Sequence, residues 1–250
     1  MARRSLAHAQ EAIPDWFGRL PSTPCEVVPI PAHEAEHSTI AYYLDPAADG
    51  SRPGRYYVNR SHPETRPRYE AEALAFHESV PGHHLQVALA QELTALPKFR
   101  RFGQPTAYVE GWGLYAERLA DEMGLYSDDL ERIGMLAADS WRSCRLVVDT
   151  GLHALGWGRR QAIDFMAANA PVSVGEIEVE VDRYIGMPGQ ALAYKIGQRE
   201  IFRLRKDAAA RLGARFDIRA FHDVVLGSSS VRLPVLRTLV EDWVSSAESS

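Results

Sequence analysis

The chain has 250 residues, of which 46% are hydrophobic and 24% are charged, enough to form a substantial core in one or two domains. Its formal net charge is −5, and its Lys and Arg residues are spread along the sequence, which argues against a nucleic-acid partner. No apolar run approaches the roughly 20 residues that a membrane-spanning helix requires, so no membrane segment is expected.

The first residues carry no apolar stretch of the kind found in secretory signals, so a cytoplasmic location is the default expectation. The two cysteines, Cys25 and Cys144, lie far apart and lack CxxC spacing. Neither a disulfide framework nor a thiolate metal site is therefore indicated.

Residues 25–60 hold three short runs rich in β-branched and aromatic side chains, separated by Pro, Asp and Gly. This pattern predicts a small antiparallel sheet near the N-terminus. From residue 68 the apolar period changes to that of helices, and it continues to about residue 245. The expected fold is mainly α-helical, with one domain over residues 1–250.

Several helices are predicted from their start and stop signals. One helix enters and leaves a histidine cluster at residues 77–84. A second opens at Pro105 and closes at Gly124, and a long third runs from the Ser127-Asp128-Asp129 cap towards His153. Ser173 and Glu176 fit a capping box that starts a fourth helix. Residues 191–212 and 233–244 supply two more.

The histidine cluster reads His77-Glu78-Ser79-Val80-Pro81-Gly82-His83-His84. In HExxH zinc sites, two histidines four residues apart bind the metal and the glutamate activates water. Here His77 and His83 are six residues apart, which places them on nearly opposite faces of a regular helix. We expect a helix bulge at Pro81-Gly82 to restore the pairing, with Gly82 in backbone angles closed to other residues.

His84 is the alternative second ligand. It lies on the same face of an ideal helix as His77, but the rise of about 10.5 Å stretches two ligands that must each lie within about 2.1 Å of one ion. His83 is therefore ranked above His84. We expect His84 either to hydrogen-bond one of the ligating side chains without binding the metal itself, or to contact substrate.

A third protein ligand is needed at a catalytic zinc, and Glu110 is the best candidate. It lies on the helix after the one that carries the histidines, in a segment where Gly111 and Gly113 allow close helix approach. Glu117 shares its face and could hydrogen-bond a ligating imidazole. The plain alternative for both glutamates is a charge on a helix surface.

A structural role for the histidines is also the plain alternative, since single histidines on helices are often core residues. Three histidines and a glutamate within eight residues, interrupted by a costly Pro-Gly break, favour the metal interpretation.

These residues resemble the bacterial family catalogued as domain of unknown function 885, which carries HE-x-x-PGHH-x-Q followed by EGW-x-LYAE. Both motifs stand here almost complete, at residues 77–86 and 110–117, and weaker matches extend over most of the chain. That family is similar to the gluzincin metallopeptidases of the thimet oligopeptidase and carboxypeptidase Taq types. The resemblance implies a zincin-like helical catalytic core.

By this resemblance, His77, His83 and Glu110 bind zinc and Glu78 is the general base. Members of the family are usually much longer, with a helical half before the part matched here. The chain is accordingly expected to lack an N-terminal helical half, which a dimer or another partner would replace; the oligomeric state is left open.

Further site residues are expected on later helices. Arg145, Asp149 and His153 recur every four residues on one face of the long helix, where a mutually paired solvated face is an equal alternative. Arg145 is a possible substrate contact, and His153 is a candidate catalytic residue.

The segment after Tyr184 contains a Pro-Gly break followed by Gln190 and Tyr194. The Tyr194 phenol could donate to the oxyanion that forms as water attacks a carbonyl. Tyr184 and Gln190 are possible contacts to the substrate or the oxyanion, although buried tyrosines are often simple core residues.

The expected function is that of a zinc-dependent hydrolase, most simply a metallopeptidase that cleaves peptide bonds. An amidase or esterase using another amide or ester substrate would need the same motif. A non-catalytic scaffold stabilised by metal is the third possibility, and the presence of Glu78 argues against it.

Overall fold

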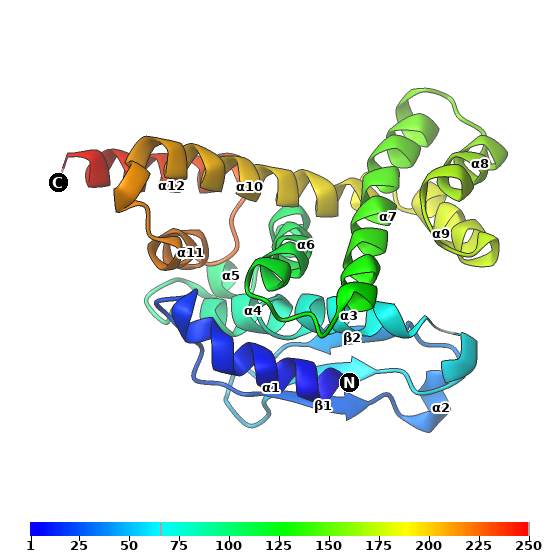
Figure 1. Cartoon of the computed structure of the whole chain (residues 1–250), viewed down its shortest axis with the longest axis horizontal. Helices are drawn as coiled ribbons and strands as arrows, with labels where there is room; N and C mark the ends of the chain where they lie inside the picture. The colour runs from blue at the N-terminus through cyan, green and yellow to red at the C-terminus, as the bar shows by residue number, and fades with distance from the viewer. Residues whose placement is uncertain (66, 250) are drawn as a thin grey trace.

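The computed structural model describes residues 1–65 and 67–249 and is mainly helical, as expected from the sequence (Figure 1). A small sheet and α1 (Ala2–Ala12) form one layer, and the later helices are stacked on it. The N-terminus lies beside the sheet, and the C-terminus lies at the far end of the helical layer.

The sheet contains β1 (Cys25–Pro29), β2 (Ala41–Leu44) and β3 (Gly54–Val58), in the order β1-β3-β2. β2 and β3 pair antiparallel, but β1 pairs with β3 in parallel, so the sheet is mixed and the fully antiparallel arrangement was wrong. The reason is that β3 inserts between β1 and β2. Alternation along a strand identifies the strand, but it does not fix which neighbour the strand pairs with.

The helices that position the site carry clear sequence signals at their ends. The Asp128 side chain accepts hydrogen bonds from two backbone N–H groups of α7, and Ser173 does so for Glu176 of α9, confirming both predicted caps. Gly124 follows α6 with φ +71, as a helix-ending glycine should. The helices after the sheet are α3 (Ala71–Glu78), α4 (His83–Glu92), α5 (Lys98–Arg101), α6 (Thr106–Glu122), α7 (Asp129–Ala154), α8 (Arg159–Asn169), α9 (Val174–Gly186), α10 (Ala193–Leu212), α11 (Ile218–Leu226) and α12 (Leu233–Glu248).

The main core surrounds α6, which packs against α10 on one side and α3 on another. Gly111 of α6 approaches Gly197 of α10 so closely that a Cβ on Gly111 would lie 2.4 Å from the Gly197 Cα. Gly111 therefore serves the contact with α10, whereas the sequence had suggested the histidine helix.

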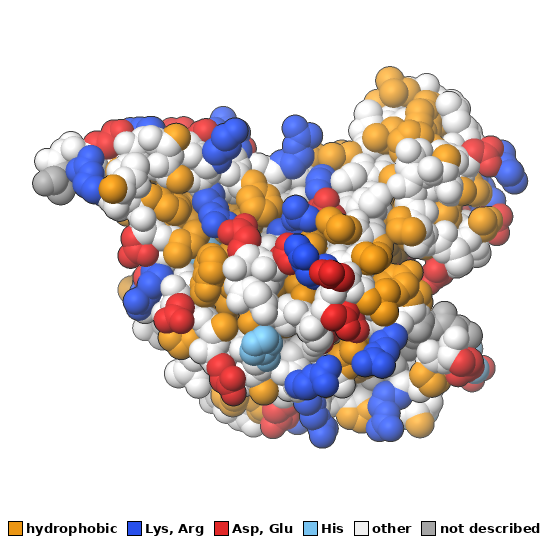
Figure 2. Space-filling view, in the orientation of Figure 1, with side chains coloured by type: hydrophobic (Ala, Val, Ile, Leu, Met, Phe, Trp, Pro, Cys, Tyr) orange, Lys and Arg blue, Asp and Glu red, His pale blue; other side chains and the backbone are white. Residues whose placement is uncertain are grey.

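A smaller apolar cluster joins α7, α8 and α9, which project as an arm from the helical layer (Figure 1). Among the described residues, no helix is long and apolar enough to cross a membrane. On the face shown in Figure 2, basic and acidic side chains are interspersed, in agreement with the even spread of charge in the sequence.

Candidate functional site

The chain between the two histidine-bearing helices is a complete break. α3 ends at Glu78 and α4 begins at His83, so the expected bulge within one helix was wrong. The indole Nε1 of Trp112 donates to the Pro81 carbonyl oxygen at 3.0 Å and ties the break to α6. Gly82 has φ −81, and a Cβ there would lie 1.9 Å from the His77 carbonyl oxygen. A side chain at this position would collide with that carbonyl, so the close approach requires glycine.

The break brings the two predicted histidines together with the predicted glutamate. His77 Nε2 and His83 Nε2 each lie 3.6 Å from Glu110 Oε2, and the two imidazole rings are 4.6 Å apart. Potential ligand atoms of all three residues lie within 4.8 Å of one another. Two ligands bonded at about 2.1 Å to a tetrahedral ion are about 3.4 Å apart, so the spacing fits a single zinc ion.

Glu117 orients the His77 ring by contacting Nδ1, the nitrogen that does not face Glu110. Its Oε1 lies 2.7 Å from His77 Nδ1, and both side chains are almost fully buried. A carboxylate at Nδ1 holds a proton there and fixes the ring orientation, so that Nε2 is the ring nitrogen that faces Glu110 and His83. Gly113 makes room for this arrangement, because a Cβ on it would lie 2.6 Å from His77 Cε1.

The electrostatics of the cluster favour a cation. Burial alone would lower the pKa of the His77 imidazole, but Glu110 and Glu117 raise it to about 10. Burial would likewise raise the pKa of the Glu110 carboxyl, yet its contacts with His77 and His83 hold it well below its usual range. The carboxylates thus stabilise positive charge between the imidazoles, and either a proton or a metal ion satisfies them.

The cluster opens into a pocket of about 350 Å³, a volume suited to a small ligand or a short peptide segment. Glu78 and Tyr194 line it together with His77, His83 and Glu110. The Tyr194 ring lies 6.5 Å from the His77 ring, centroid to centroid. The pocket lining includes residues that the sequence analysis missed, namely Tyr42, Tyr43, Asp45, Val87, Gln104, Val109, Arg142, Glu180 and Arg183.

His84 points away from this pocket. Its Nδ1 lies 2.9 Å from the Tyr43 hydroxyl and its Nε2 lies 3.0 Å from the Thr23 carbonyl oxygen. Burial lowers the pKa of His84 to about 4, so the ring is neutral at neutral pH. His84 therefore joins Tyr43 of β2 to α4; it does not itself line the pocket, although Tyr43 does.

The polar stripe on α7 divides between the pocket and the base of the arm. Arg145 lines the pocket, and its Nε donates to the Tyr184 hydroxyl at 2.8 Å. Asp149 accepts from the Gly189 backbone N–H at 3.0 Å. His153 Nε2 lies 2.9 Å from the Tyr184 carbonyl oxygen, outside the pocket lining. The stripe is thus partly a structural contact between α7 and α9.

The remaining predicted residues lie around Tyr194. Gln190 Nε2 donates to the Tyr194 hydroxyl in a long contact of 3.4 Å, and Gln190 does not line the pocket. Tyr184 is buried, and its hydroxyl accepts from Arg145 and from the Trp141 indole. Tyr194 is therefore the predicted tyrosine that borders the candidate metal site.

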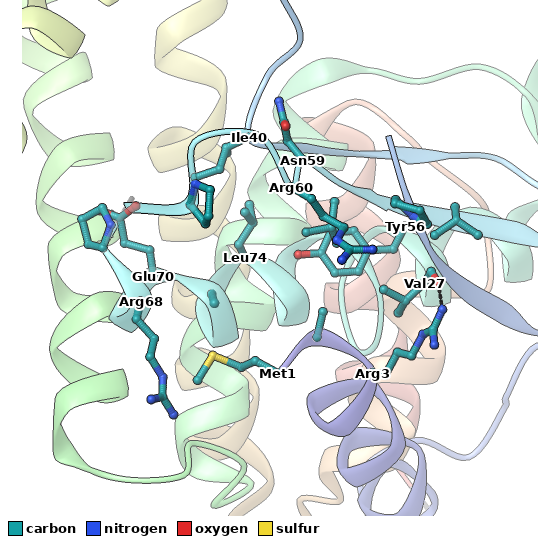
Figure 3. Close-up of a pocket in the computed structure, with 17 residues that line it drawn as sticks. Met1, Arg3, Val27, Ile40, Tyr56, Asn59, Arg60, Arg68, Glu70 and Leu74 are labelled. Atoms are coloured by element: carbon teal, nitrogen blue, oxygen red, sulfur yellow. Dashed lines mark hydrogen bonds between the residues drawn. The ribbon is translucent and has the colours of Figure 1, made fainter. Parts of the chain in front are cut away.

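A larger cavity, of about 500 Å³, lies between α1, the sheet and α3. Figure 3 shows its lining, in which Leu74, Tyr56 and Val27 lie above Met1 in this view, together with Arg3, Arg60 and Arg68. The described residues there include no group of three metal-ligating side chains. The chemistry is concentrated in the smaller pocket, which we take as the functional site.

Comparison with protein families identifies the chain. Residues 1–240 match the family described as "Bacterial protein of unknown function (DUF885)", and the chain belongs to this family. No curated protein matches the chain.

Two solved structures share the fold. A candidate lipoprotein from Colwellia psychrerythraea is 39% identical, with a TM-score of 0.94 over 98% of this chain and 42% of that protein. A candidate lipoprotein of unknown function from Shewanella oneidensis is 24% identical, with a TM-score of 0.81 over 96% of this chain and 45% of that protein. The chain thus spans less than half of the length of either protein.

Proposed function

We propose that this member of the family is a zinc-dependent hydrolase that cleaves peptide bonds. The observation that carries the proposal is the meeting of His77, His83 and Glu110, whose facing ligand atoms have the spacing that one tetrahedral ion requires. The Glu117 contact with His77 Nδ1 supports it, because metal-ligating histidines commonly donate their other N–H to a carboxylate.

The residues around the ligands suit hydrolysis. Bound by these three side chains, zinc would act as a Lewis acid and lower the pKa of a water molecule. Glu78 lines the same pocket, adjacent in sequence to His77, and would accept the proton of the attacking water and return it to the departing amine. Tyr194 would donate a hydrogen bond to the oxyanion that forms on the carbonyl.

Glu78 also bears on the choice between an enzyme and a metal-stabilised scaffold. A structural zinc site is closed by four protein ligands, whereas the cluster here offers three and opens into a cavity lined by a carboxylate. Both features favour catalysis. The gluzincin resemblance agrees with this assignment of roles and remains part of the proposal.

The proposal extends to the size of the active protein. Since both solved relatives are more than twice as long as the part this chain matches, we infer that an additional half, or a second subunit, would complete one wall of the cleft.

A cytoplasmic location is likewise a proposal, and fractionation of cells that express the native gene would test it.

The first test is metal content, measured by elemental analysis on protein purified without chelators. We expect about one zinc per chain. Glu110→Ala should weaken zinc binding by more than about 100-fold, because even loss of a residue that only orients a ligand costs about 10- to 100-fold. Glu122→Ala, at the exposed end of the same helix, is the matched control. A parent protein without metal would contradict the proposal.

The second test separates catalysis from metal binding. Glu78→Gln should retain zinc and reduce hydrolysis of unblocked peptides by about 100-fold or more, the usual contribution of a general base. If the variant hydrolyses peptides normally, Glu78 is not the base. Hydrolysis of simple esters or non-peptide amides, with none of peptides, would reassign the substrate to the amidase or esterase class.

A further inference from the structure

The pocket that holds the candidate metal ligands is also lined by three arginines, which we call its basic wall. Arg142 and Arg145 come from neighbouring turns of α7, and Arg183 comes from α9. All three line the same pocket as His77 and Glu110. Three guanidinium groups beside a candidate hydrolytic centre indicate that the pocket receives a negatively charged part of its ligand.

Arg145 is held rigidly at the centre of this wall. Only 4% of the residue is exposed, its Nε donates to the Tyr184 hydroxyl at 2.8 Å, and its Nη2 donates to Glu180 Oε2 at 3.0 Å. Its Nη1 is buried and has no hydrogen-bond partner among the described residues. Two of its donors are thus paired within the protein, which holds the guanidinium in place at the pocket wall before a ligand binds.

Arg142 and Arg183, like Arg145, each have one buried nitrogen without a hydrogen-bond partner among the described residues. Arg183 Nη2 donates to the same Glu180 oxygen at 3.0 Å, which places its head beside that of Arg145. The Nε atoms of Arg183 and Arg142 are also buried without a hydrogen-bond partner in the described part of the chain. Glu180, and Glu70 acting on Arg142, offset part of the positive charge but do not balance three guanidiniums. The wall therefore retains an excess of positive charge.

Tyr194 sets the distance between the basic wall and the metal ligands. Its ring centroid lies 6.5 Å from that of His77 and 4.8 Å from Arg145 Cζ. The distance from Arg145 Cζ to the centroid of the His77 ring is therefore at most the sum of these two distances. An extended chain advances about 3.3–3.6 Å per residue, so a group bound at Arg145 would lie no more than about three residues from a carbonyl held at the candidate ligands.

We propose that Arg142, Arg145 and Arg183 bind the α-carboxylate of a peptide, so that the protein removes a short fragment from peptide C-termini. The inference rests on the proposed function and specifies its substrate class. Planar guanidinium groups suit a carboxylate because they can donate two parallel hydrogen bonds to it. In the reaction, water adds across the amide: the carbonyl carbon gains an oxygen, its bond to nitrogen breaks, and the released amine keeps the water proton.

The test compares one peptide as its free acid and as its C-terminal amide, using the zinc-loaded full chain. The free acid should have a kcat/KM about 10- to 100-fold higher, the effect of one hydrogen bond to a charged group. Arg142→Gln and Arg183→Gln should each remove much of this preference, mainly by raising KM for the free acid. Arg160→Gln, an 82% exposed arginine on α8, should leave it unchanged.

Two results would overturn the inference. One is equal cleavage of acid and amide. The other is an amidated peptide with Asp or Glu near its end that is cleaved as well as the free acid, which would assign the wall to acidic side chains. Arg145→Met extends the series if it folds, and the two more accessible arginines keep the test decisive if it does not.

A binding experiment separates this inference from the proposed function. Calorimetric titration of zinc-free Glu78→Gln with an N-acetyl dipeptide acid, and with its amide, measures carboxylate recognition without catalysis. Binding of the acid that Arg183→Gln weakens by about 10-fold would support the basic wall even if no peptide were hydrolysed. Equal affinity for acid and amide would refute it even in an active enzyme.

Discussion

The two sides of α6 each face a buried histidine, and the two rings differ in charge. His77, 3% exposed, lies against Glu110 and Glu117, which raise its pKa to about 10. His222 of α11, fully buried, lies between the Tyr115 hydroxyl and the Trp16 carbonyl oxygen, each at 2.8 Å, and burial lowers its pKa to about 3. Burial is similar, so the charge of the partners decides which ring attracts a cation.

The helical period separates these environments. Glu110, Gly113 and Glu117 occupy one face of α6, whereas Trp112 and Tyr115 occupy another and contact His222 with their rings. One helix can therefore supply a polar wall for chemistry and an aromatic wall for stability. The same difference explains why, of these two rings in the described chain, His77 belongs to the candidate ligand cluster and His222 does not.

The largest expected effect is the loss of zinc affinity when the carboxylate charge of Glu117, which contacts His77 Nδ1, is removed. Glu117→Gln keeps the shape but cannot hold a proton on Nδ1 as a carboxylate does, so zinc affinity should fall by about 10- to 100-fold. Competition with a chelating fluorophore measures the change. Asp121→Asn, on the same helix in a partly exposed ion pair with Arg132, is the control. Unchanged affinity would mean that Glu117 does not orient the ligand.

The second expected effect is a decrease in the free energy of unfolding at acidic pH, caused by His222. Since the folded pKa of His222 is depressed, the unfolded chain binds more protons below the ordinary value of 6.5, and stability falls as pH drops from there towards about 3. The loss is about 1.4 kcal/mol per pH unit for this group. Urea unfolding of zinc-free protein at pH 7 and pH 5 measures it.

His222→Gln should reduce the difference between the two pH values, although the variant will be less stable at both. His84, whose pKa is also depressed, remains as background in both proteins. An identical pH dependence in parent and variant would show that His222 titrates normally in the folded state.

The smallest expected effect concerns the hydroxyl that satisfies His222. Tyr115→Phe removes the donor to Nε2 and should destabilise the protein by about 1–2 kcal/mol, because a buried acceptor is left without its partner. Thermal unfolding measures the loss. Zinc affinity should stay unchanged, because Tyr115 lies on the opposite side of α6 from the ligands. A loss of zinc would show that the two sides are coupled.

How much of this arrangement was predictable depends on sequence distance. The Asp128 and Ser173 caps were predicted correctly because local side-chain hydrogen bonds determine them. α1, α8 and α11 were not among the predicted helices. The parallel pairing of β1 was missed because strand partners depend on the whole sheet.

The sequence by itself determined the chemical content of the site: a histidine-glutamate motif, an irregularity at Pro81-Gly82 and a glutamate on a later helix. It did so because helical spacing and ligand chemistry are local rules.

Only the tertiary structure decided the rest. It placed His83 beside His77 and Glu110 and directed His84 to Tyr43 and Thr23, since α4 begins anew after the break. It also gathered Arg142, Arg145 and Arg183 into one wall. The sequence had offered Arg145 as a possible substrate contact but had not singled out Arg142 or Arg183. The packing of α9 against α7 brings the three guanidinium groups to one pocket.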